Sequence, residues 1–298
     1  MRFFTVFILA TAVSAHGVVM SVEGANGVSM PGLSIADGTP RDCSSNRCGS
    51  QADTSIIRDR EIRSGEASAL GRTQGNGPVD ASVMISNFLG TGGNVPTNNG
   101  SSESVGVEDN LSNLPGGGAR KHRRQVGNFL GGLFGGGAAG RGGDKNDGPP
   151  EARVAASTGE GATSGLPTAS DDGEVTLTYR QVNQDGAGPM TADIDATSGG
   201  TDPDAFQSAE VTQDVPGLGI QGLSLATNTD FPLKVQMPEG MTCEGSVGGA
   251  ENVCIVRVRN GAAAGPFGGS GAFTQSATAR KRAFAYRLKK RMEIARKH

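Results

Sequence analysis

The chain has 298 residues, of which 48 are glycine; it contains no tryptophan, 4% of its residues are aromatic, and its formal net charge is −3. A sequence with so few large apolar side chains is not expected to pack along its whole length. The charge is unevenly divided, because residues 280–298 hold nine Lys or Arg and one Glu while the rest of the chain is acidic. An acidic body argues against a nucleic-acid partner.

Residues 1–15 have the layout of a secretory signal peptide. Met1 and Arg2 form a charged start, residues 3–13 are an apolar run too short to span a bilayer, and Ser14 and Ala15 are small. We expect cleavage after Ala15. The product would be secreted, extracellular or held in the cell wall.

Cleavage would make His16 the amino terminus and the first residue of a predicted opening strand over residues 16–20. A terminal histidine can chelate one metal ion through its α-amine and its imidazole, and these nitrogen ligands suit copper. A histidine at this place can also be accidental. A copper brace needs a second imidazole as well, and the other two histidines are poorly placed: His122 lies in a KHRR loop at the dibasic pair Arg123–Arg124, and His298 ends the tail.

Four cysteines in a secreted chain predict two disulfides rather than a zinc site, because no paired CxxC spacing occurs. Three connectivities are possible. We favour Cys43–Cys48 and Cys243–Cys254, since each pair lies within one local segment. A short helix is plausible over residues 54–64, where alternating charges indicate a solvated face.

Residues from about 90 to 169 are predicted to form a disordered, exposed glycine-rich insertion, because the segment lacks a sustained apolar period. It contains two glycosylation sequons, at Asn99 and Asn110. Such short sequons also arise by chance.

The clearest strands follow residue 171. Apolar and polar residues alternate in residues 174–182, 231–237 and 254–259, with turn signals between them. We predict an all-β fold, an antiparallel immunoglobulin- or fibronectin-like β-sandwich with long loops, as a single domain over residues 16–279. The turn that follows the first of these strands carries Asp185, our candidate third metal ligand. The alternative is a turn aspartate that bonds its own backbone.

Residues 280–298 are predicted to be a basic C-terminal helix or tail. Phe284, Leu288 and Met292 are four residues apart and would form one stripe of a helix. Weak contact with a membrane or with wall polymer is one interpretation, and a solvated, mobile end is the other.

Other chemistries lack support in the sequence. The glycines of residues 131–143 lack the GK[ST] ending of a phosphate loop, and no histidine lies near a plausible serine nucleophile. The acids Asp171, Asp172, Asp193 and Asp195 lie at predicted strand ends or turns, where solvated aspartates are normal. No catalytic residue is therefore assigned.

Four long strings carry a family resemblance: HGVVMSVEGANG (16–27), QVNQDGAGPMTADIDATSGGTDPDAF (181–206), FPLKVQMPEGMTCEG (231–245) and NGAAAGPFGGSGAFTQ (260–275). Together they resemble the fungal appressorium-specific secreted virulence-factor family, over most of residues 16–275. That family is similar in layout to copper monooxygenase-like proteins. The resemblance implies His16 as a ligand and makes Phe273 or Tyr179 a candidate aromatic neighbour of the metal, with ordinary core packing as the alternative for both. Arg180 stands where a histidine would have completed a brace.

Together with the resemblance, the sequence predicts a secreted protein that binds copper through His16, and the resemblance implies that it is a fungal surface protein acting in appressorium-mediated host penetration. Its expected partner is cell-wall polysaccharide or the host surface. The alternative is a copper-dependent, lytic polysaccharide monooxygenase-like oxidase of wall polysaccharide. A carboxylate from Asp185 in place of a second imidazole favours binding over oxygen activation.

Overall fold

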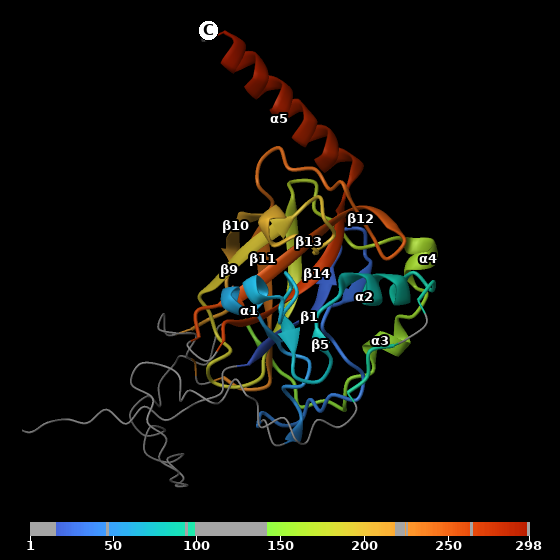
Figure 1. Ribbon diagram of the computed structural model, residues 1–298, viewed down its shortest axis with the longest axis vertical. Coiled ribbons are helices and arrows are strands. Elements are labelled where there is room, and N and C mark those ends of the chain that lie inside the picture. The colour runs from blue at the N-terminus through green and yellow to red at the C-terminus, as the bar shows by residue number, and fades with distance from the viewer. Residues whose placement is uncertain are drawn as a thin grey trace, which may run out of the picture.

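The computed structural model describes residues 16–45, 48–92, 95–98, 142–217, 224, 226–262 and 265–296. Within these ranges the chain is mostly β-structure, with short helices around the strands and a long terminal helix that projects from the body (Figure 1). The strands are β1 (Gly17–Glu23), β2 (Ser29–Pro31), β3 (Ser55–Ile56), β4 (Arg72–Thr73), β5 (Gly77–Pro78), β6 (Asp144–Lys145), β7 (Thr168–Ala169), β8 (Glu174–Gln181), β9 (Met190–Asp195), β10 (Phe206–Gln213), β11 (Thr229–Gln236), β12 (Gly245–Val247), β13 (Ala250–Asn260) and β14 (Phe267–Gln275). The helices are α1 (Asp59–Ser64), α2 (Ala81–Phe88), α3 (Arg153–Ala156), α4 (Gly161–Ser164), the 3-10 turn Pro203–Ala205 and α5 (Ala277–Ala295).

The described strands form one hydrogen-bonded sheet of 14 strands. Its main path runs β2-β1-β8-β11-β10-β9-β13-β14-β3-β4-β5, and β12, β6 and β7 pair beside it with β13, β11 and β14. The pairings along this path are antiparallel, whereas β7 lies parallel to β14. The predicted all-β, antiparallel class is therefore confirmed. The sandwich topology stays a prediction.

The alternating segments form strands as predicted. In β8, Leu177 and Tyr179 point into the core, and in β11, Phe231 and Leu233 do the same. The register places Phe231 opposite Tyr179 and Leu233 opposite Leu177, so the apolar faces of both strands coincide. Matched faces bury these side chains together, which is the main favourable term in forming the pair.

One hydrophobic core joins strands that lie far apart along the sheet path. It includes Val19 of β1, Ile194 of β9, Val256 of β13 and Phe273 of β14. Strand β14 carries small residues where β1 crosses it, and a Cβ on Gly271 would come within 2.3 Å of Val22. Only glycine permits this approach, so the run of glycines in β14 is a packing feature. A second cluster packs α2 against β1, β2 and β13.

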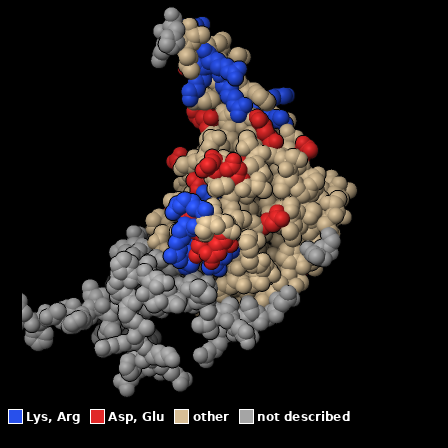
Figure 2. Space-filling view, in the orientation of Figure 1, with Lys and Arg blue, Asp and Glu red and all other residues tan. Residues whose placement is uncertain are grey.

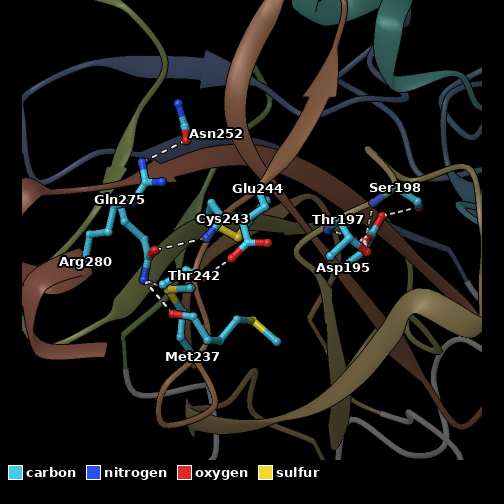
Figure 3. Close-up of a disulfide and its surroundings, with 12 residues drawn as sticks. Asp195, Thr197, Ser198, Met237, Thr242, Cys243, Glu244, Asn252, Gln275 and Arg280 are labelled. Atoms are coloured by element: carbon cyan, nitrogen blue, oxygen red, sulfur yellow. Dashed lines mark hydrogen bonds between the residues drawn. A yellow bond between two sulfur atoms is a disulfide. The ribbon is translucent and has the colours of Figure 1, made fainter. Parts of the chain in front are cut away.

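Both disulfides have the predicted pairing, Cys43–Cys48 and Cys243–Cys254. Figure 3 shows the second disulfide, where Gln275 receives a hydrogen bond from the backbone N–H of Cys243 and donates one to the carbonyl of Met241. The loop that contains Cys243 is thereby fastened to the end of β14. Disulfides of this kind persist in oxidising compartments.

The chain from residue 142 to 169 differs from the expectation of an exposed insertion. Val154 of α3 is fully buried, and Glu151 accepts hydrogen bonds from Arg41, which also pairs with Asp53. The contact between Arg41 and Glu151 joins residues 110 positions apart, so no local sequence pattern predicts it. The predicted helix over residues 54–64 is also shorter, because Ser55 and Ile56 form β3 and the helix begins at Asp59.

Several predictions fall outside the described residues. They are the signal peptide over residues 1–15, the sequons at Asn99 and Asn110, His122 with the dibasic pair Arg123–Arg124, and His298. The glycine-rich residues 99–141 lie there too. These predictions stay as stated.

The basic C-terminal segment forms the predicted helix. Helix α5 projects from one end of the sheet, away from the body (Figure 1). Ser276 caps its first turn by accepting a hydrogen bond from the N–H of Ala279. None of the helices in the described ranges combines the length and the apolar composition needed to cross a membrane.

Candidate functional site

His16 is the residue on which the predicted site depends, and it lies buried directly before β1. Its backbone N–H donates to Oδ1 of Asn183 at 2.8 Å. Its carbonyl oxygen accepts from the N–H groups of Val182 and Asn183. The main chain of His16 is thus held by the segment that follows β8.

That segment is a tight turn, and it contains Asp185. The N–H of Gly186 donates to the carbonyl of Asn183, which closes the turn. A Cβ on Gly186 would lie 2.2 Å from the carbonyl oxygen of His16, so only glycine fits here. The Asp-Gly pair of the sequence therefore lets the turn pack directly against His16.

Asp185 is buried, with 6% of its surface exposed. Within the described part of the chain, nothing donates a hydrogen bond to its Oδ1 atom. Burial disfavours the charged carboxylate and raises the pKa of Asp185 to about 6. A buried acceptor without a donor is costly, and such atoms in native folds call for an explanation such as a bound ion.

The aromatic neighbour of His16 is Phe267, the first residue of β14. The two rings lie 4.4 Å apart between centroids, at an interplanar angle of 32°. Tyr179, one of the two predicted neighbours, lies beside the turn and donates its hydroxyl to the carbonyl of Gly186. The other predicted neighbour, Phe273, packs in the main core opposite Cys254.

Asn260, the last residue of β13, fastens the two halves of the site. Its Nδ2 donates to the carbonyls of Asp185 and Ala187, at 2.9 and 3.3 Å. Its Oδ1 accepts from the N–H groups of Ala262 and Phe267. One buried side chain therefore positions both the turn with Asp185 and the ring that contacts His16.

Sequence reasoning missed Asn183, Asn260 and Phe267. All three lie inside the quoted family-like strings, which are the only signal that could have singled them out. Their roles depend on contacts between segments about 80 and 170 residues apart in sequence.

Arg180, which the resemblance places where a histidine would complete a brace, makes buried structural contacts in this fold. Its guanidinium is buried and pairs with Asp230 at 3.0 Å. It also donates to the carbonyls of Arg41 and Asn146. Arg180 thereby ties β8 to two loops, and its fork of donors is well suited to several acceptors at once.

The available metal donors are few. No group of three or more His, Cys, Asp or Glu side chains lies together in the ranges that the structure describes. A cleaved amino terminus would let His16 supply an amine as well as an imidazole, and Asp185 would add a carboxylate oxygen. These are the donors that a copper ion could use here, and the Oδ1 atom of Asp185 receives no hydrogen bond within the described chain.

Comparison with known proteins gives a consistent result. Residues 14–268 match the family model described as Egh16-like virulence factor. The appressoria-specific virulence factor GAS2 of Pyricularia oryzae is 56% identical over 282 residues, which cover 95% of this chain and 91% of that protein. The appressoria-specific virulence factor GAS1 of the same fungus is 40% identical over 129 residues, 42% of this chain and 50% of that protein. No solved structure matches.

Proposed function

Since this chain belongs to the Egh16-like virulence factor family, we propose that it is a secreted appressorial surface protein that takes part in host penetration and binds one copper ion at His16. The identity to an appressoria-specific virulence factor over 95% of the chain supports the biological setting. The two disulfides agree with passage through the secretory pathway.

The copper proposal rests on one observation above all. The buried Oδ1 atom of Asp185 has no donor in the described chain, and it belongs to the turn that packs against His16. A copper ion held by the amine and imidazole of His16 would give this oxygen a partner. The charge of the ion would then offset the cost of burying the Asp185 carboxylate, so the deprotonated form of Asp185 would be favoured.

We propose binding in preference to oxidation. A copper ion can support redox chemistry when bound, but the brace that activates oxygen uses two imidazoles. His16 is the one histidine within the described ranges. Position 180 of β8 is an arginine, which pairs with Asp230 and donates to two backbone carbonyls, so this position supplies no second imidazole. Release of oxidised oligosaccharides from cellulose, chitin or pectin in the presence of a reductant would instead support the alternative, a copper-dependent oxidase of wall polysaccharide.

We also propose that the sheet folds into the two facing layers of an immunoglobulin-like sandwich. Support comes from β10, which pairs with β11 on one side and with β9 on the other. The core shared by β1 and β8 with β13 and β14 has the composition expected between two such layers.

Calorimetric titration tests the copper site. The chain that begins at His16 is compared with the same chain carrying one extra alanine before His16. We expect one tight copper ion on the first protein and at least about a hundredfold weaker binding on the second, because the extra residue removes the terminal amine from the chelate. Equal, weak affinity for both would refute the proposal.

A further inference from the structure

Helix α5 has a surface that the copper site does not explain. Its residues Ala279 and Ala283 are buried against the body, and most of the remaining helix is exposed. The family match ends at residue 268, before this helix begins. The helix lies outside the residues that the family model matches, and its function is a separate question.

The exposed face of α5 is apolar along a narrow stripe. Phe284, Leu288 and Met292 are 50%, 60% and 50% exposed. Because they are four residues apart, each lies only about 40° around the helix from the last, so the three form one continuous line. Five large apolar side chains are strongly exposed among the described residues, and α5 carries four of them, Ile294 being the fourth. Such concentration marks a contact surface.

Basic side chains flank this stripe. Helical geometry places Arg287 and Arg291 along one side and Lys281 and Lys289 along the other, with Arg280 in line with the stripe one turn before Phe284. The guanidinium groups of Arg280 and Arg287 lie about 6 Å from the centre of the Phe284 ring, at 5.9 and 6.0 Å.

Figure 2 shows Lys and Arg side chains gathered on the projecting helix. Arg282 and Arg287 form ion pairs with Asp172 and Glu244 of the body. Lys281, Lys289 and Arg291 form no ion pair within the part of the chain that the structure describes. Their charge is available to an external partner.

We propose that α5 lies on an anionic lipid bilayer, with its apolar stripe in the interface and its basic flanks over the headgroups. An apolar stripe between two cationic edges is the arrangement that interfacial helices use. A polyanionic wall polymer would need only the basic groups and would leave the stripe in water. The stripe therefore favours lipid. This inference is independent of the site at His16.

Co-sedimentation with lipid vesicles tests the proposal, using the full chain from His16 to His298. We expect binding to phosphatidylcholine vesicles that contain phosphatidylserine, weaker binding to phosphatidylcholine alone, and a decrease with added salt. The variant Leu288→Ser/Met292→Ser keeps the charge and shortens the stripe. We expect it to bind at least about tenfold more weakly.

Two controls keep the result interpretable. Val83→Ser removes an exposed apolar residue of α2, away from α5, and should bind vesicles as the parent does. Circular dichroism must show that the double-serine variant keeps its helix in the presence of vesicles. A parent chain that ignores anionic vesicles, or a folded serine variant that binds them equally well, would overturn the proposal. The proposal would also be overturned if the parent and the double-serine variant bound polygalacturonate equally well and neither bound the vesicles.

Discussion

The ring of Phe267 lies 4.4 Å from the imidazole of His16, although the two residues are 251 positions apart in sequence. This contact brings the first strand to the start of the last strand of the sheet. Asn260 then connects the backbone of Phe267 to the turn of Asp185. The candidate site is therefore a product of the whole fold, and its parts can be tested separately.

The variant Phe267→Ala is expected to lower the free energy of unfolding by about 3–5 kcal/mol, because it removes a fully buried ring and leaves a cavity beside His16. Chemical denaturation measures this loss. Phe284→Ala, at the half-exposed position on α5, serves as the matched control and should change stability by less than about 1 kcal/mol. Similar losses at both positions would contradict the packing described for His16.

Asp185→Asn is expected to stabilise the copper-free protein at neutral pH. The pKa of Asp185 is about 6 in the fold, against 3.8 for an ordinary aspartate, so the folded state binds the proton more tightly. Stability should therefore decrease as pH rises from about 4 to 6, by an amount on the order of 2 kcal/mol. The variant lacks this group and should lose that pH dependence. Thermal unfolding across this range measures both effects.

The same variant should have the opposite effect on copper, because it removes a ligand. We expect its copper affinity to fall at least about tenfold, while Asp204→Asn, at an exposed turn, should leave affinity and stability unchanged. Copper binding to the parent should also weaken below pH 6, where Asp185 takes up its proton. Unchanged affinity in Asp185→Asn would remove Asp185 from the site.

Asn260→Ala is expected to cost at least about 2 kcal/mol of stability. It deprives two carbonyls and two N–H groups of their partner inside the protein. Thr191→Ala, which removes one exposed hydrogen bond on the neighbouring strand β9, should cost about 1 kcal/mol or less. Equilibrium unfolding in urea separates these values, and a neutral Asn260→Ala would show that Asn260 does not fasten the site.

Arg180→Ala is expected to cost about 3–5 kcal/mol, because it leaves the carboxylate of Asp230 and two carbonyls without their buried partner. Arg60, whose side chain is 72% exposed, provides the comparison: Arg60→Ala should change stability by less than about 1 kcal/mol. If both arginines proved equally dispensable, the interpretation of Arg180 as a structural tie would fail.

The parts of the fold that the sequence predicts are those with a local signal. Alternation identified β8 and β11, short spacing favoured the observed pairing of Cys243 with Cys254, and four-residue spacing placed Phe284 on the exposed stripe of a helix. Each of these depends on residues close together in the chain, and the structure confirms each.

The parts that escaped prediction depend on distant partners. Composition suggested an exposed segment up to residue 169, but Arg41 pairs with Glu151 and thereby holds that segment in the fold. The resemblance offered Phe273 or Tyr179 as the aromatic neighbour of a metal, with ordinary core packing as the alternative for both, whereas the ring that contacts His16 is Phe267 at the start of β14. Phe267 and Phe273 are six residues apart on β14, and which of the two lies beside His16 depends on how β14 pairs with the neighbouring strands.

The most direct test of the copper site is electron paramagnetic resonance of the copper-loaded chain that begins at His16. The account predicts a bound copper(II) spectrum with hyperfine coupling to two nitrogens, the amine and the imidazole of His16. It also predicts that the spectrum changes in Asp185→Asn. A spectrum that is the same after an extra residue is added before His16, or that matches the aqueous ion, would contradict the account.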